Sequence, residues 1–294
     1  MTEKWSQLGA TLWDESVPIA GTPAEAYLRG RGITSLPGPE VLRFHPAVQH
    51  LKLKRKLPAL IAQVTGGVEP SHNFTWLSAD GAGKADTEKA EQRRTLGSSK
   101  GGAVRLAEPI DGKPLIVGEG IETTATAMEA TGLPGWASLG TSGLGNIEWP
   151  GDVREVILLA ENDENGANQR ALDKVCPVLA GQGLKVRVAT PPAGFGDFND
   201  LVDPNKEGGG PGGLVIAKMI IEARRNGGRS ATRAQTHRRR NKHHKLPSLS
   251  ISPRPAAIFS AIQPTKLTLA SSPRTQRASI EKRTDSVPRA SICG

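Results

Sequence analysis

The stretch Pro114-Leu-Ile-Val-Gly-Glu119-Gly120 decides the fold, because an apolar run ends abruptly in a glutamate between two glycines. The pattern returns twice: Val156-Ile-Leu-Leu-Ala160 runs into Glu161-Asn-Asp163, and Lys185-Val-Arg-Val-Ala189 leads to Gly196-Asp197-Phe-Asn-Asp200. Helical segments separate these runs: 121–131 is rich in small residues and threonine, and 166–181 has apolar residues at helical spacing. Short strands that alternate with helices predict an α/β fold with a parallel sheet.

Carboxylates follow each of these three apolar runs. Ligands of an open parallel sheet bind at the carboxyl ends of its strands, so we expect these carboxylates on one rim. They are Glu119, Glu161, Asp163, Asp197 and Asp200. Carboxylates gathered in this way repel one another unless a cation neutralises them, and Mg²⁺ is a hard ion that prefers oxygen ligands. The sequence therefore predicts a site for Mg²⁺, or for Mn²⁺ in its place.

Two folded regions are expected before a change in composition near Arg225. Residues 111–225 are predicted to form the α/β domain, and residues 1–110 a smaller α+β subdomain in which Thr22 caps a helix that Pro23 begins. The predicted helices cover residues 1–19, 23 to 30 or 32, 121–131, 166–181 and 214–224. The predicted strands cover residues 58–64, 74–77, 114–117, 135–139, 156–160 and 185–189, with a turn at 81–84 and a loop at 140–143.

The charge of the chain is unevenly distributed. The 294 residues carry a formal net charge of +9, but residues 1–221 hold 22 Lys/Arg and 26 Asp/Glu, whereas residues 222–294 hold 16 and 3. The last segment has Phe259 as its only aromatic residue, and such a composition buries too little apolar surface to fold. We expect residues 226–294 to be a basic disordered tail that binds polyanions non-specifically through 237–245. An out-of-frame extension with no specific role is the alternative.

Several classes of protein are disfavoured. Two cysteines are too few for a disulfide framework or a zinc ribbon. No apolar segment is long enough for a signal sequence or a membrane span, so we expect a cytoplasmic protein without a membrane partner. The dinucleotide fingerprint is disfavoured because Thr123 replaces its third glycine, and Gly81-Ala-Gly-Lys84 lacks the first glycine and the final Ser/Thr of a P-loop.

The motifs taken together resemble the Toprim domain, which bacterial-type primases, topoisomerases and some nucleases share. Its hallmarks are a strand-end glutamate before glycine, as in Ile116-Val-Gly-Glu119-Gly120, and an Asp-x-Asp before a helix that a glycine begins, similar to Glu161-Asn-Asp163-Glu-Asn-Gly166. Pro191 to Leu201 is similar to a downstream acidic segment of primases. Segments between Thr22 and Gly97 resemble the region before Toprim in phage and plasmid primases, so the resemblance covers about residues 5–205.

The resemblance assigns roles to the carboxylates. It implies that Glu119 is a general base or metal-site glutamate, that Asp163 is a metal-binding carboxylate, and that Asp197 is an additional one. Glu119 and Asp163 are therefore the expected catalytic residues. Glu161 stands where the family has the first aspartate of the pair. Glu161 keeps the negative charge, but its side chain is one methylene longer. Because Mg²⁺ demands a strict coordination geometry, this difference bears on whether the site is active.

The resemblance implies the catalytic core of a DNA primase, which synthesises RNA primers on single-stranded DNA in plasmid- or phage-type replication. Two divalent ions would clamp the attacking and leaving oxygens of the phosphoryl transfer. The implied partners are a single-stranded DNA template, ribonucleoside triphosphates and a separate replicative helicase. Basic residues would hold the template and the triphosphate. The candidates are Arg29, Arg31, Lys84, Arg93, Arg94 and Lys100.

Other functions stay open. A Toprim nuclease would use the same metals to cleave nucleic acid. A catalytically inactive, DNA-binding primase remnant is suggested by Glu161, by the basic tail and by the lack of any CxxC pair, since primases of this kind usually begin with a zinc ribbon. We expect a core without that zinc module, which begins at the segment that would follow it. A topoisomerase is disfavoured, because Tyr27 is the only candidate for its nucleophile.

Overall fold

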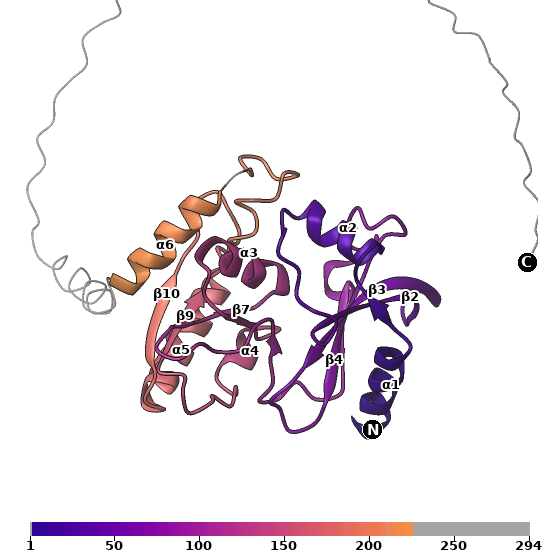
Figure 1. The fold of residues 1–294 in the computed structure, drawn as a ribbon, viewed down its shortest axis with the longest axis horizontal. Coiled ribbons are helices and arrows are strands. Elements are labelled where there is room, and N and C mark those ends of the chain that lie inside the picture. The colour runs from indigo at the N-terminus through magenta and orange to yellow at the C-terminus, as the bar shows by residue number, and fades with distance from the viewer. Residues whose placement is uncertain (1, 211, 226–294) are drawn as a thin grey trace, which may run out of the picture. The chain divides into compact units, whose positions relative to one another are not determined.

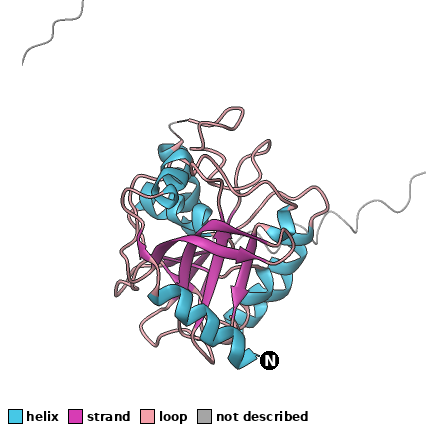
Figure 2. Cartoon of the chain, turned by 90° about the vertical axis from the view of Figure 1, so that its right-hand side faces the viewer, coloured by secondary structure: helices cyan, strands magenta, loops and turns pink. Residues whose placement is uncertain are grey.

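The computed structural model describes residues 2–210 and 212–225, which fold around two five-stranded sheets (Figure 1). The first sheet is antiparallel and has the strand order β1-β2-β3-β4-β5. Its strands are β1 (Val17–Pro18), β2 (Leu42–His50), β3 (Arg55–Val64), β4 (Ser71–Trp76) and β5 (Arg93–Leu96), and the short 3₁₀ helix η1 (Lys89–Glu91) precedes β5. Helix α1 (Thr2–Asp14) packs across this sheet (Figure 2), and α2 (Pro23–Gly30) contacts β2 and β3.

The second sheet has the strand order β10-β9-β7-β8-β6. The four strands β7 to β10 are parallel, and β6 pairs with β8 in the antiparallel sense. The strands are β6 (Val104–Arg105), β7 (Leu115–Gly118), β8 (Gly135–Ala137), β9 (Glu155–Leu159) and β10 (Lys185–Ala189). The helices of this half are α3 (Ile121–Thr131), α4 (Thr141–Leu144), α5 (Ala167–Gly181) and α6 (Gly213–Arg225).

Helices cover both faces of the second sheet. Val117 of β7 and Leu158 of β9 belong to a core cluster that includes Leu172 of α5. Their neighbours Ile116 and Ile157 belong to a different cluster, which includes residues of α3 and α6. Successive side chains of a strand point to opposite faces, so a strand buried on both faces must be apolar throughout. This is why the central strands β7 and β9 stand out in the sequence as apolar runs.

A third core cluster joins the two sheets. Leu28 of α2 and Leu60 of β3, each 1% exposed, pack in the same cluster as Ile121 of α3, which is 4% exposed. A backbone bridge between Thr65 and Ala103 also connects the end of β3 to the residue before β6. The first sheet is therefore fixed against the second one by apolar contacts between residues distant in sequence.

The predicted fold class is confirmed, since a parallel α/β sheet follows an α+β region. The helices predicted at 121–131, 166–181 and 214–224 and the strands predicted at 114–117, 156–160 and 185–189 agree with the structure to within one residue at each end. Gly132 ends α3 in the left-handed conformation (φ 67°), which glycine adopts without steric cost.

Some predictions were wrong in the details. The helix predicted over 1–19 ends at Asp14, and Val17–Pro18 pairs with β2 instead. The loop predicted at 140–143 contains the short helix α4. The sequence did not predict β2 or β5. A register shift between His45 and Val48, around Pro46, interrupts the alternation that would have marked β2.

Parts of the prediction fall outside what the structure describes. The predicted tail, residues 226–294, lies outside the described residues, and the domain boundaries at 110 and 225 stay predictions. Within residues 2–210 and 212–225, none of the helices is both long and apolar enough to cross a membrane.

The cluster that joins the two sheets should dominate stability. We expect Leu28→Ala to lower the free energy of unfolding by about 2–5 kcal/mol, because it removes a fully buried side chain and leaves a cavity. Urea unfolding followed by circular dichroism measures the change. Leu8→Ala is the matched control, since Leu8 is 42% exposed on α1 and should lose less than about 0.5 kcal/mol. Equal losses in the two variants would contradict the assignment of this cluster.

Candidate metal centre and its basic surroundings

The acidic residues gather where the strand order reverses. The chain passes from β7 to β8 on one side of β7 and then returns to β9 on its other side. Ligands of open α/β sheets bind at the carboxyl ends of the strands beside such a point. Glu119 directly follows β7, and Glu161 and Asp163 come shortly after β9. The parallel pairing of Val117 with Leu158 brings these strand ends level with each other.

Asn168, which sequence reasoning missed, connects the two strand ends. Its side chain is buried on the first turn of α5. Its Nδ2 donates a hydrogen bond of 2.5 Å to Oε1 of Glu119, and its Oδ1 accepts one of 3.0 Å from the backbone N–H of Glu161. The sequence offered one signal, which is that an asparagine occupies the second position of the helix that follows β9.

Asp163 contributes to the same region in a different way. Its Oδ2 accepts hydrogen bonds from the backbone N–H groups of Ala167, at 2.6 Å, and Asn168, at 3.1 Å. These are among the free N–H groups at the start of α5, where a negative charge is stabilised. Asp163 therefore fixes the helix that carries Asn168. Burial is the main cause that raises the pKa of Glu119, and the charge of Asp163 adds a smaller rise.

The loop after β10 is tied to the loop after β9. The Nδ2 of Asn162 donates to the carbonyl oxygens of Pro191, Pro192 and Phe195, and its backbone N–H donates to Gly196 at 2.7 Å. Asp197 comes next, and its Oδ1 accepts hydrogen bonds from the backbone N–H groups of two following residues. These bonds hold the third predicted acidic segment against the second one. Asp200 instead binds the N–H of Gly196 and pairs with Lys206.

Burial and mutual repulsion raise the pKa of three of these carboxyl groups. Burial, followed by the charges of Glu119 and Asp197, raises the pKa of Glu161 to about 7. Burial raises the pKa of Glu119, although the hydrogen bonds from Asn168 and the Thr141 backbone oppose this effect. Burial and the neighbouring Asp200 raise the pKa of Asp197. Glu161 therefore interacts electrostatically with both Glu119 and Asp197, and these three carboxyl groups form the acidic set of the site.

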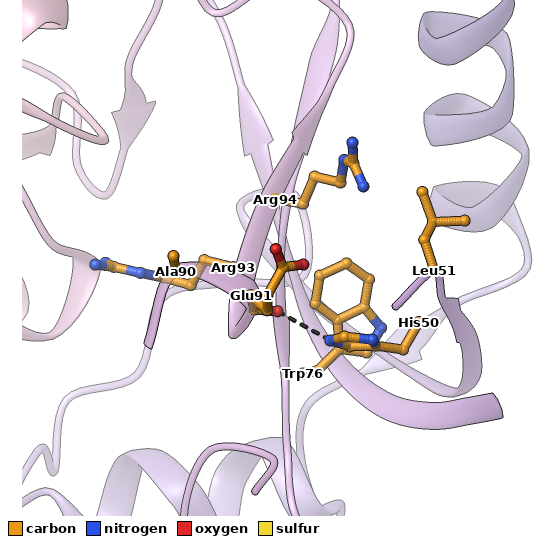
Figure 3. A pocket seen from close by; sticks show the side chains of 7 residues that line it. All are labelled: His50, Leu51, Trp76, Ala90, Glu91, Arg93 and Arg94. Carbon is orange, nitrogen blue, oxygen red and sulfur yellow. Dashed lines mark hydrogen bonds between the residues drawn. The ribbon is translucent and has the colours of Figure 1, made fainter. Parts of the chain in front are cut away.

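Cations from the first half of the chain lie near this set. The charges of Arg93 and Lys89 oppose the rise in the pKa of Glu161, and Arg93 likewise opposes the rise in the pKa of Glu119. The charge of Arg31 likewise opposes the rise in the pKa of Asp197. Figure 3 shows that Arg93 and Arg94 extend to opposite sides of β5, as successive strand residues do. Only Arg93 of this pair acts on the carboxylates.

The other predicted basic residues lie elsewhere or have partners. Arg29 pairs with Glu25 at 3.1 Å and donates to the carbonyl of Thr34. The guanidinium of Arg94 lies 5.9 Å from the centre of the Trp5 ring. Lys100 is exposed on a loop beyond β5. These contacts use Arg29 and Arg94 locally and leave Arg31, Lys84 and Arg93 as the predicted cations nearest to the acidic region.

Two buried ion pairs hold Arg31 and Lys84 in place. Arg31 pairs with the buried Asp203 at 2.9 Å, and Lys84 pairs with the buried Glu122 at 3.0 Å. Tyr27, which is 2% exposed, donates its hydroxyl to the same Glu122. Burial, followed by the Glu122 charge, raises the pKa of Tyr27 well above its usual range. A topoisomerase role for Tyr27 is thereby further disfavoured, because its oxygen is buried and engaged.

The chemistry of the acidic set suits a hard divalent cation, although its side chains are not preassembled around one. Among residues 2–210 and 212–225, no three His, Cys, Asp or Glu side chains are placed as a ready-made metal-binding group. The donors nevertheless are all carboxylate oxygens, the ligands that Mg²⁺ and Mn²⁺ prefer. Their raised pKa values reflect burial first and repulsion by neighbouring carboxylates second, and a bound cation would relieve that repulsion. Glu119, Glu161 and Asp197 are the residues that fit this role.

A separate pocket of about 230 Å³ lies on the first sheet (Figure 3). Its lining residues are His50, Leu51, Trp76, Ala90, Glu91, Arg93 and Arg94. The His50 ring is buried, and its Nε2 lies 3.0 Å from the carbonyl oxygen of Glu91. This contact ties the His50 ring to the backbone just before β5, and Glu119, Glu161 and Asp197 do not line the pocket.

Comparison with known proteins gives a family for each half. Residues 3–106 match a domain of unknown function, DUF7146, and residues 114–207 match the family described as Toprim domain. No curated protein matches the sequence significantly.

Similar solved structures include primases. The Aquifex aeolicus primase, comprising its zinc-binding and RNA polymerase domains, is 14% identical with a TM-score of 0.50, and the match covers 75% of this chain and 61% of that one. The primase fragment of the bacteriophage T7 primase-helicase is 19% identical with a TM-score of 0.39, over 62% and 65% of the chains. The DnaG primase catalytic domain bound to single-stranded DNA is 13% identical with a TM-score of 0.45, over 75% and 80%.

The likeness to the Aquifex structure concerns the fold alone. Together with the family match, the central parallel sheet and the glutamate at the end of β7 lead to one conclusion. The segment from residue 114 to residue 207 of this chain is a Toprim domain.

Proposed function

We propose that this chain is the catalytic core of a DNA primase, which uses Mg²⁺ or Mn²⁺ to synthesise RNA primers on single-stranded DNA in plasmid- or phage-type replication. The observation that carries the proposal is the set formed by Glu119, Glu161 and Asp197, which follow three parallel strands and in which Glu161 interacts with the other two charges. Cations from the first half of the chain lie near this set. A metal-dependent reaction of phosphate esters needs both features.

The acidic set would hold the metal. Glu119, Glu161 and Asp197 supply oxygen ligands, and Asp163 sets the position of the α5 turn that orients Glu119 through Asn168. A divalent cation bound there would stabilise the negative charge that develops on the phosphoryl oxygens.

The residues of the chain then have separate tasks in primer synthesis. The oxygen of a 3′-hydroxyl bonds to the α-phosphorus of the incoming ribonucleoside triphosphate, the bond to the pyrophosphate oxygen breaks, and Glu119 accepts the hydroxyl proton. Asn168 holds the Glu119 carboxylate in a fixed position, which suits this task. Arg93 and Lys84 would bind phosphate oxygens through charge-assisted hydrogen bonds. A separate replicative helicase is the partner proposed for supplying the single-stranded template.

Primer synthesis tests the proposal directly. We expect the parent to incorporate labelled ribonucleotides into short RNA on single-stranded DNA with Mg²⁺ or Mn²⁺. Glu119→Gln and Asp163→Asn should each lower the rate by about a hundredfold or more while keeping the shape of the side chain, since the first removes the general base and the second removes a charge that acts on it. Asparagine also still caps α5.

Asp152→Asn is the matched control for these variants, because Asp152 is an exposed carboxylate before the opposite end of β9. Its rate should equal that of the parent. Cleavage of the template without RNA synthesis, with the same dependence on Glu119 and Asp163, would replace the primase by a Toprim nuclease. DNA binding with neither activity would leave a catalytically inactive primase remnant.

The raised pKa of Glu161 predicts a pH-dependent stability. Burial and the charges of Glu119 and Asp197 raise this pKa from 4.5 to about 7, so the folded protein binds the proton more tightly than the unfolded chain does. Without metal, stability is therefore lost as the pH rises from about 4.5 to about 7. Glu161→Gln removes this loss, so we expect its gain in Tm over the parent to grow between about pH 5 and about pH 8.

Calorimetry in the presence of a chelator measures this difference, and added Mg²⁺ should reverse it, because the cation stabilises the ionised parent. Glu164→Gln serves as the control, since Glu164 is exposed three residues further on. A gain in Tm for Glu161→Gln that is the same at both pH values would show that the pKa of Glu161 is not raised in the folded protein.

A further inference from the structure

Glu122 is a buried carboxylate to which the sequence assigned no role. It lies on the first turn of α3, three residues after Glu119, and is 7% exposed. Its Oε1 accepts a hydrogen bond of 2.5 Å from the Tyr27 hydroxyl and lies 3.0 Å from Nζ of Lys84. Both partners belong to the first half of the chain, so Glu122 connects that half to the Toprim domain beside the acidic set.

Glu122 is charged at neutral pH despite its burial. Burial alone would raise the pKa, but the Lys84 ammonium, the Tyr27 hydroxyl and the Arg93 guanidinium outweigh it and lower the pKa of Glu122 to about 2. A buried charge is costly unless it is paired and hydrogen-bonded. Such an arrangement suits a group that holds a cation in a defined position.

Lys84 is fixed in place but retains capacity to bind a ligand. It ends a tight turn in which a Cβ on Gly81 would lie 2.2 Å from the carbonyl oxygen of Pro23, so this turn lies directly against the start of α2. Lys84 also forms a backbone bridge with Leu77. An ammonium group has three donors, and the side chain of Lys84 is 24% exposed. Donors not used by Glu122 can therefore reach a ligand.

Arg93 approaches Glu122 across Gly120. A Cβ on Gly120 would lie 3.4 Å from Oε2 of Glu122 and 3.9 Å from Nη1 of Arg93. Gly120 directly follows Glu119, so both charged groups lie beside the backbone that carries the predicted general base. The lack of a side chain at Gly120 keeps this space open.

We propose that Glu122 is a positioning residue, which holds the Lys84 ammonium and attracts the Arg93 guanidinium beside Glu119, so that both cations face a phosphate group of the substrate. This inference rests on the proposed function, because it places a phosphate-bearing substrate at the same site. Tyr27 supports the arrangement by satisfying the buried Glu122 oxygen. A nucleoside triphosphate and a nucleic-acid backbone both carry such a phosphate group. Binding experiments with one ligand of each kind distinguish these two sources.

Glu129 provides a matched control on the same helix. Its carboxylate also binds the first half of the chain, through the backbone N–H groups of Thr34 and Ser35. It is remote from Lys84 and lies on the last turns of α3, away from the end of β7. Glu129→Gln therefore tests the effect of weakening a contact between the halves without altering the cations at the site.

Equilibrium binding to the full chain tests the proposal with inorganic tripolyphosphate and, separately, with an oligothymidylate. The variants are Glu122→Gln, Lys84→Met, their double variant and Glu129→Gln, each checked for folding by thermal unfolding. We expect Glu122→Gln to weaken binding of one ligand about tenfold or more, the effect of losing a charge-assisted hydrogen bond. The ligand affected identifies the source of the phosphate. Glu129→Gln should bind as the parent does.

The double variant shows whether Glu122 acts through Lys84. In that case the effect of Glu122→Gln becomes clearly smaller once Lys84 is methionine, whereas independent effects would add. Additive effects, or unchanged binding in Glu122→Gln, would overturn the proposal, as would a parent that binds neither ligand. If Glu122→Gln does not fold, Tyr27→Phe takes its place, since it removes one hydrogen bond of Glu122 and should weaken binding to a lesser degree. Binding that behaves as expected in a protein without primer synthesis would overturn the primase proposal and leave this one standing.

Discussion

The parallel pairing of β7 with β9 is the constraint on which the candidate site depends. It places Glu119 and Glu161 at adjacent strand ends, where burial and like charge disfavour ionisation of both groups. The first turn of α5 reduces this cost, because Asn168 donates to Glu119 and accepts from the backbone of Glu161. A neutral amide is suited to this position, since a third carboxylate there would add to the repulsion and a cation would compete with a metal.

The two halves of the structure contribute opposite charges to the site. The acidic groups belong to the Toprim domain, whereas Arg31, Lys84, Lys89 and Arg93 belong to the region that matches DUF7146. The net charge of +9 conceals this division, because it is determined by residues 222–294. A site divided in this way functions only if the halves are fixed relative to each other. The shared apolar cluster and the pairing of Lys84 with Glu122 meet that need.

Sequence reasoning predicted what depends on local pattern and missed what depends on distant partners. The strands around Ile116 and Ile157 were predictable because burial on both faces makes such runs apolar, and the glutamate and glycines that follow mark their ends. Asn168 and Glu122 were missed because their partners are 49 and 95 residues away. Of six basic residues predicted to bind substrate, Arg29 and Arg94 have other partners nearby, Glu25 and Trp5, which charge counting cannot reveal.

Glu161 is where this chain departs from the aspartate expected of its family, and the structure gives the departure a physical meaning. Its pKa of about 7 means that, without metal, the group is divided between its protonated and ionised forms near neutral pH. A metal ligand must be deprotonated, so metal binding at this site releases a proton and strengthens as the pH rises. The longer side chain also gives the carboxylate more freedom to move away from Glu119 and Asp197 while no cation holds it. In this respect the glutamate favours a site that is assembled by its metal over one that is built before the metal binds.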